Sequence, residues 1–178
     1  MDRPKPPDLA RIRVVLLDVD GVLTDGRIVW GTGGLSVRGF HSRDGVGLKI
    51  LKQAGLVSGI ISGGHSEATV LRAKELGIDH VAQGVGNKTR QYEAMRSSIP
   101  FTDDEACFIG DDLTDLGPMS RVAFPVAVAD APPEVKRRAA LVTALRGGRG
   151  AVREVIELIL RAQGKWEAIV RAYETGER

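Results

Sequence analysis

The chain of 178 residues has little of what several classes of protein require. Cysteine occurs once, as Cys107, which excludes an internal disulfide and a zinc site made of several cysteines. Aromatic residues make up 4% of the chain and do not cluster, so the stacking surface that binds single-stranded nucleic acid is missing. A formal charge of +2 creates no field that would attract nucleic acid or an anionic membrane. We therefore expect no nucleic-acid partner.

Long apolar runs are also absent. No stretch approaches the roughly 20 apolar residues that cross a bilayer. The first 13 residues hold three prolines and lack the apolar region of a secretory signal. We expect a cytoplasmic protein without a membrane partner, folded as one domain over residues 1–178 with a flexible lead-in at residues 1–11.

The order of apolar runs predicts an α/β fold. Short β-branched runs alternate with longer amphipathic ones, which is typical of a Rossmann-like parallel sheet flanked by helices. We expect strands at 14–17, 57–61, 80–82, 106–109 and, as the last strand, 122–128. We expect helices at 44–54, 67–76, 88–97 and, as the last helix, 151–163.

Two segments stand apart from this alternation. Residues 26–40 predict a β-hairpin flap, because apolar runs at 28–30 and 35–37 flank the glycine-rich turn at 31–34. Residues 147–150, with three glycines, predict a flexible joint at the start of the C-terminal segment and helix, residues 147–178.

Glycine accounts for 22 of the 178 residues, about 12% against an average share of about 7%. Several of these glycines stand beside polar residues at the ends of predicted strands. The carboxyl ends of parallel strands meet at one edge of a sheet, where ligands bind. We expect six side chains to gather there: Asp18, Asp20, Ser62, Lys88, Asp111 and Asp112.

These residue types fit phosphoryl transfer. Asp18 and Asp20, two apart on a strand, should face the same way, and two such carboxylates need a cation. An all-oxygen site favours Mg²⁺. Ser62 and Gly63 offer a hydroxyl and free backbone N–H groups to a phosphate, and Lys88 adds a positive charge.

Each motif alone also has a plain interpretation. Asp-x-Asp-Gly is a common turn, Ser-Gly-Gly a turn, Gly-Asp-Asp a helix cap, and a lone lysine is mostly a solvated surface residue. Their joint occurrence, each after a predicted strand, favours the functional interpretation. His65, just past Ser62, is a candidate to touch substrate, whereas Cys107, inside a strand, is expected to be inert core.

Together the motifs resemble those of the haloacid dehalogenase superfamily. They are residues 18–22, Ser62, Lys88 and residues 110–115. The resemblance is closer to the capless, tetrameric family of 3-deoxy-D-manno-octulosonate (KDO) 8-phosphate phosphatases, and it covers residues 12–163. It is carried there by residues 23–26, 43–45, 83–84, 126–131 and 147–154. It implies a haloacid dehalogenase fold with the hairpin flap and without a large cap domain.

The resemblance also implies a role for each matching residue. Asp18 would be the nucleophile that forms an aspartyl-phosphate, and Asp20 the general acid and base. Asp18, Asp20 through its backbone carbonyl, and Asp111 would hold Mg²⁺. Ser62, Gly63 and Lys88 would bind the phosphoryl group, with Asp112 and Asp115 supporting the metal and Lys88. Arg72 and Arg149 match positions that contact substrate in the family.

The implied activity is Mg²⁺-dependent hydrolysis of a 2-keto-3-deoxy sugar acid phosphate, KDO 8-phosphate first, in lipopolysaccharide biosynthesis. The implied assembly is a homotetramer joined through the hairpins. Gly64 departs from the pattern, since these phosphatases usually carry arginine there and relatives acting on sialic-type acids can carry glutamate. A nine-carbon sialic-type acid 9-phosphate or another small phosphoester is therefore the alternative substrate. A non-catalytic assembly module is disfavoured, because both Asp18 and Asp20 are present.

Overall fold

The computed structural model describes residues 7–34 and 36–177. Its centre is a six-stranded sheet in the order β5-β4-β1-β6-β7-β8, in which every neighbouring pair is parallel. The strands are β1 (Val14–Leu17), β4 (Val57–Ile61), β5 (His80–Ala82), β6 (Ala106–Gly110), β7 (Phe124–Ala127) and β8 (Leu141–Val142). The predicted Rossmann-like α/β fold is confirmed.

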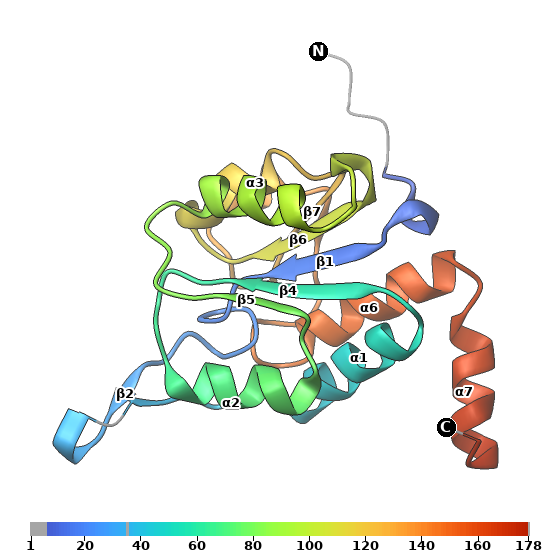
Figure 1. Cartoon of the computed structure of the whole chain (residues 1–178), viewed down its shortest axis with the longest axis horizontal. Helices are drawn as coiled ribbons and strands as arrows, with labels where there is room; N and C mark the ends of the chain where they lie inside the picture. Colours follow the sequence, from blue (N-terminus) through green and yellow to red (C-terminus); the bar gives the residue numbers. More distant parts are fainter. Residues whose placement is uncertain (1–6, 35, 178) are drawn as a thin grey trace.

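Helices cover both faces of this sheet. On one side lie α1 (Ser42–Gln53), α2 (Glu67–Leu76) and α6 (Ala151–Ala162), and on the other lies α3 (Lys88–Ser98) (Figure 1). The strands β1 and β6 are buried along their whole length, as expected of strands covered on both faces. Cys107 is among these buried residues, and none of the described helices is long and apolar enough to cross a membrane.

Short helical segments fill the connections between these elements. They are 3₁₀ turns at Leu9–Arg11, Asp103–Glu105 and Leu113–Asp115, and the single helical turns α4 (Leu116–Met119) and α5 (Pro133–Lys136). The first of them lies within the expected flexible lead-in, and Asp8 caps it by accepting from the Ala10 N–H at 3.2 Å. Residues 1–6 of that lead-in lie outside the described residues.

Besides these short segments, the described part of the chain contains a strand and a longer helix that were not predicted. The strand at 122–128 is shortened to Phe124–Ala127 and is not the last, because β8 pairs with it. The helix that ends at Ala162 is not the last either, because α7 (Trp166–Thr175) follows the turn at Gly164, whose φ is +66°. A strand of two residues leaves no periodic signal. In α7, however, Trp166, Ile169 and Val170 do follow the helical spacing.

The predicted hairpin is present, with shorter strands than expected. β2 (Val29–Trp30) pairs antiparallel with β3 (Ser36–Val37), and the chain reverses at Gly33, which has a φ of +74°. Leu35, expected in the second strand, lies outside the described residues. The hairpin projects away from the sheet and its helices (Figure 1). Trp30 is 71% exposed, and Ile28, Val29 and Val37 are exposed as well.

The segment at 147–150 is tightly packed, so the expectation of a flexible joint is wrong. The Gly148 N–H donates to the Val22 carbonyl at 2.8 Å. A Cβ on Gly147 would lie 1.7 Å from the Gly21 carbonyl oxygen, and one on Gly148 would lie 2.3 Å from the Thr24 carbonyl carbon. These glycines allow close approach to the turn that follows β1, rather than freedom of motion.

Candidate active site

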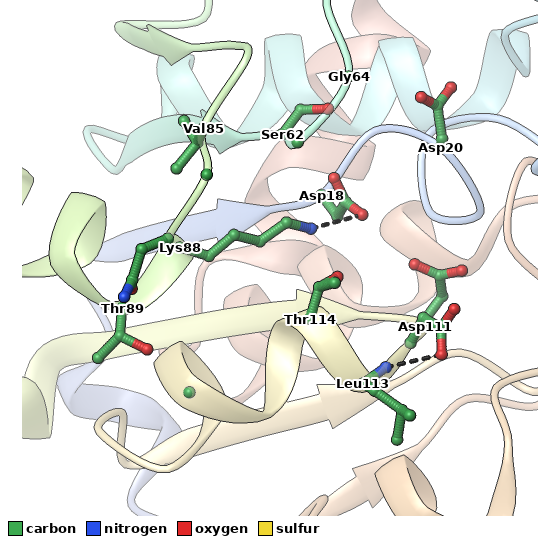
Figure 2. A pocket seen from close by; sticks show the side chains of 15 residues that line it. Asp18, Asp20, Ser62, Gly64, Val85, Lys88, Thr89, Asp111, Leu113 and Thr114 are labelled. Carbon is green, nitrogen blue, oxygen red and sulfur yellow. Dashed lines mark hydrogen bonds and ion pairs between the residues drawn. The ribbon is translucent and has the colours of Figure 1, made fainter.

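The predicted edge of the sheet carries a cavity of about 520 Å³ (Figure 2). Its walls come from the ends of β1, β4 and β6 and from the loop that leads from β5 into α3. All of the six side chains that the sequence places at this edge line the cavity: Asp18, Asp20, Ser62, Lys88, Asp111 and Asp112. Gly63 and Gly64 line it too, as do Leu113 and Thr114 of the motif at 110–115 and five residues that the sequence did not single out: Val85, Gly86, Asn87, Thr89 and Gly117.

The turn after β1 holds Asp18 at the base of this cavity. The Asp18 N–H donates to the Ile109 carbonyl at 3.1 Å and so continues the sheet ladder. The chain then leaves the strand at Gly21, whose φ of +95° suits glycine. A Cβ at Gly21 would lie 2.1 Å from Asp111 Oδ2, so this glycine also admits the Asp111 carboxylate. The buried Thr24 hydroxyl accepts from the Gly21 N–H at 3.3 Å, which stabilises the turn.

Lys88 joins the ends of two strands through its ammonium group. It is the first residue of α3, which Asn87 caps, and its Nζ lies 2.8 Å from Asp18 Oδ2 (Figure 2). The same Nζ lies 2.7 Å from Asp115 Oδ1. All three side chains are buried. Burial alone would lower the pKa of Lys88, but the charges of Asp115 and Asp18 outweigh burial and raise it. Lys88 is therefore a buried cation, not the solvated surface lysine of the plain interpretation.

Asp115 supports the loop after β6. Its Oδ2 accepts from the Asp111 N–H at 2.9 Å and the Asp112 N–H at 3.3 Å, while its Oδ1 accepts from Lys88. Asp112 itself caps the following turn, with Oδ1 accepting from the Leu113 N–H at 2.7 Å. Both oxygens of the fully buried Asp115 are thus occupied, and this arrangement aims the Asp111 side chain into the cavity.

The buried acids fit a divalent cation. Asp18, Asp111 and Asp115 each offer an oxygen, and the three atoms lie within 4.8 Å of one another. Among the described residues, nothing hydrogen-bonds to Asp18 Oδ1 or Asp111 Oδ1, although both atoms are buried. Since Asp115 is saturated by donors, Asp18 and Asp111 supply the free ligand atoms. Carboxylate oxygens without histidine or cysteine are the donor set of Mg²⁺.

The pKa values of these acids point the same way. Burial, and then the charge of Asp115, raise the pKa of Asp18 to about 6. Burial, and then the charges of Asp115 and Asp18, raise the pKa of Asp111 to about 8. Carboxyl groups whose ionised form is this disfavoured are stabilised by a cation bound between them.

Asp20 is turned away from this acidic cluster. We predicted Asp18 and Asp20 on the same face of a strand, but β1 ends at Leu17 and the chain turns at Gly21, so strand alternation does not apply. Instead, Asp20 pairs with Arg38 of the hairpin, at 2.7 Å from Nε to Oδ1 and 3.1 Å from Nη2 to Oδ2. The sequence carries no signal for this contact, which joins two loops 18 residues apart.

Ser62 follows β4 and is buried at the cavity wall, with Gly63 beside it. Its carbonyl accepts from the Val85 N–H at 3.1 Å, which ties this loop to the one that precedes α3. The three candidate substrate residues do not reach the cavity within this one chain. His65 is exposed, Arg72 pairs with Glu75 at 2.7 Å, and Arg149 lies 3.4 Å from Asp25.

Comparisons with known proteins agree with this geometry. Residues 58–156 match the haloacid dehalogenase-like hydrolases. The KDO 8-phosphate phosphatase KdsC of Yersinia pestis is 42% identical over 158 residues, covering 89% of this chain and 84% of that protein. KdsC of Escherichia coli K12 is 42% identical over 154 residues, covering 86% and 82%.

Solved structures of such phosphatases have the same fold. One is that of the Moraxella catarrhalis KDO 8-phosphate phosphatase in complex with a magnesium ion, a phosphate ion and KDO. It has a TM-score of 0.91 at 36% identity and covers 93% of this chain and 95% of that one. The cobalt-bound phosphatase of Haemophilus influenzae has a TM-score of 0.87 at 37% identity, covering 89% and 93%. This chain therefore belongs to the haloacid dehalogenase-like hydrolases, in the family of the KDO 8-phosphate phosphatases.

Proposed function

We propose that this protein hydrolyses KDO 8-phosphate, with Mg²⁺, to KDO and inorganic phosphate. The observation that carries the proposal is the state of Asp18, which is buried at the cavity base with one oxygen on Lys88 and the other without a partner among the described residues. Asp111 lies within reach of the same cation. The names of the relatives and the ligands of the Moraxella catarrhalis structure support this substrate.

The chemistry divides between Asp18 and Asp20. An Asp18 oxygen attacks phosphorus, and the bond between phosphorus and the sugar oxygen breaks with its electron pair on that oxygen, which takes a proton from Asp20. Water then attacks the aspartyl-phosphate and gives a proton to Asp20, so that phosphate leaves and Asp18 is restored. Ser62, Gly63 and Lys88 hold the phosphoryl oxygens.

Mg²⁺, held by Asp18, Asp111 and the backbone carbonyl of Asp20, would neutralise charge on the phosphoryl group. Asp112 and Asp115 act on the loop rather than on the substrate, since their carboxylates accept backbone N–H groups of residues 111–113.

We also propose a homotetramer in the cytoplasm that serves lipopolysaccharide biosynthesis. The exposed apolar side chains of the hairpin support an assembly, since a two-stranded ribbon is at best marginal alone in water. Arg72, Arg149 and His65 lie outside the cavity of their own chain, and we propose that in an assembly they serve a neighbouring one.

A substrate panel tests the proposed function. The purified protein with Mg²⁺ is offered KDO 8-phosphate, a nine-carbon sialic acid 9-phosphate and simple sugar phosphates, and released phosphate is measured. We expect KDO 8-phosphate to have the highest kcat/KM, EDTA to abolish turnover, Mg²⁺ to restore it and excess Ca²⁺ to inhibit it. A preference for the sialic-type substrate would replace KDO 8-phosphate with the alternative that Gly64 raises. Full activity after exhaustive chelation would overturn the metal-dependent mechanism.

A further inference from the structure

The pairing of Arg38 with Asp20 connects the hairpin to the cavity. The guanidinium occupies both oxygens of Asp20, through Nε and Nη2, and its Nη1 donates to Ser36 Oγ at 2.7 Å. The Arg38 side chain is only 4% exposed, although the hairpin that carries it is largely exposed. The pair is part-buried, since the Asp20 side chain is 21% exposed, and its bidentate geometry makes it specific. Arg38 therefore sets the orientation of Asp20 in this state of the protein.

This orientation does not suit the proposed role of Asp20, which is to give a proton to the leaving sugar oxygen. While both oxygens face Arg38, neither is free to turn toward the oxygen of a leaving sugar. One of the two contacts has to open for that turn. Opening it leaves a buried guanidinium partly unpaired, which is costly unless another anion takes the vacated place.

Gly64 borders the place that such an anion would take. A Cβ at this position would lie 2.9 Å from Asp20 Oδ2, 3.4 Å from Arg38 Nη2 and 3.8 Å from Ser62 Oγ. Residue 64 puts no side chain there, and Asp20 Oδ2 itself fills the space while it is paired, so room for an anion arises beside Arg38 when that oxygen turns away. This space adjoins Ser62, where the phosphoryl group is proposed to bind.

Other positive charge in the cavity is already committed. Within the described part of the chain, Lys88 is the one cationic side chain that lines it, and both Asp18 and Asp115 hold its ammonium group. Arg38 lies beside Gly64 and holds one carboxylate, Asp20, so a second anionic group on the substrate can pair with it in exchange for one oxygen of Asp20.

We propose that Arg38 is a specificity-determining residue that selects phosphate monoesters carrying a carboxylate. The substrate carboxylate replaces one oxygen of Asp20 at Arg38, and this exchange lets Asp20 turn toward the leaving oxygen. A neutral sugar phosphate cannot make the exchange, so Asp20 stays paired and turnover is slow. The inference rests on the proposed function, because it assumes that Asp20 serves the leaving group.

The test compares KDO 8-phosphate with its C1 carboxamide, which has nearly the same shape and no carboxylate charge. p-Nitrophenyl phosphate is the third substrate, because its leaving group needs no proton from the protein. Each is measured as kcat and KM with Mg²⁺ for the wild type, Arg38→Met, Arg38→Lys and Arg27→Met. Arg27 is the matched control, since it is an exposed arginine on the same hairpin.

We expect the wild type and Arg27→Met to prefer the acid over the carboxamide by about ten-fold to a hundred-fold, the range expected of a charged hydrogen bond. In Arg38→Met the preference should fall to within about three-fold, largely through a higher KM for the acid, and Arg38→Lys should recover part of it. p-Nitrophenyl phosphate should stay within about two-fold in Arg27→Met, and its change in the Arg38 variants measures the part of the effect that does not depend on a substrate carboxylate.

Three results would overturn this inference: an undiminished preference for the acid in Arg38→Met, an equal loss on all three substrates, which would indicate a structural role, or a wild type that treats acid and carboxamide alike. A wild type that hydrolyses none of the three esters would instead refute the proposed function.

Discussion

The base of the cavity and the hairpin above it are stabilised in opposite ways. At the base, Asp18, Lys88 and Asp115 form a buried chain of charges that draws on three loops of one sheet edge. The hairpin has strands of two residues, exposes Trp30 to solvent, and reaches the cavity through Arg38. The base of the cavity is thus preorganised within one chain, whereas the selectivity that we propose depends on a segment whose apolar side chains are exposed in that chain.

The largest effect should follow a change at the base. Asp18→Asn keeps the shape of the side chain and removes the anion that is both nucleophile and metal ligand, so we expect turnover to fall by several orders of magnitude. Phosphate release measures the loss, and circular dichroism should show an unchanged fold. Near wild-type activity in this variant would contradict the roles given to Asp18.

Lys88→Met should show how strongly the base depends on its buried cation. It leaves three neighbouring carboxyl groups without their counter-charge, and breaking a buried pair in this way costs about 3–5 kcal/mol. Urea unfolding measures the change. Lys52→Met is the matched control, because its pair with Asp79 is half exposed and contributes less than about 1 kcal/mol. Equal losses in both variants would mean that burial of Lys88 adds nothing.

The metal-free base should also lose stability as the pH rises. The folded protein holds the Asp111 proton up to about pH 8, whereas a carboxyl with the ordinary pKa of 3.8 has released it, as in the unfolded chain. Unfolding therefore releases a proton between about pH 4 and pH 8, and the free energy of unfolding falls across that window. We expect Mg²⁺ to raise the melting temperature more at pH 8 than at pH 5. Asp111→Asn should reduce this dependence on pH, and an equal Mg²⁺ effect at both values would contradict it.

A substitution in the hairpin should change the oligomeric state of the protein and leave the stability of its fold nearly unchanged. Trp30→Ser removes an exposed indole, so we expect the stability of the isolated protomer to stay within about 0.5 kcal/mol while the proposed tetramer dissociates. Light scattering at micromolar concentration measures the mass of each form, with Arg27→Ser as a control on the same ribbon. An intact protein that is fully active as a 19.1 kDa monomer would show that the hairpin is not an assembly device.

The hydrophobic pattern of the sequence was enough to predict those strands and helices whose buried residues follow the strand or helix spacing. The strands β4 and β5 and the helix α2 have the predicted bounds, because their apolar runs end at glycine or polar residues. The gathering of strand-end residues at one cavity followed from parallel topology alone. β8 was not predicted because a strand of two residues is too short to show alternating hydrophobicity. α7 was not predicted because Gly164 separates its apolar pattern from that of the preceding helix, which we expected to be the last one.

The hydrophobic pattern and the motifs of the sequence could not predict the direction of the Asp20 side chain. It depends on where Gly21 turns the chain and on Arg38, which arrives from a different loop. The tight packing of residues 147–150 was missed for a similar reason, since glycine signals flexibility in a sequence but also permits the closest backbone contacts.

The contact of Gly147 and Gly148 with the turn after β1 sets the time at which the enzyme is completed during synthesis. The backbone that packs against the Asp18 loop is made more than 120 residues after that loop. A nascent or prematurely terminated chain that ends before Gly147 lacks that wall. We therefore expect the turn that carries Asp18 to reach its final packing only after Gly147 and Gly148 have been made.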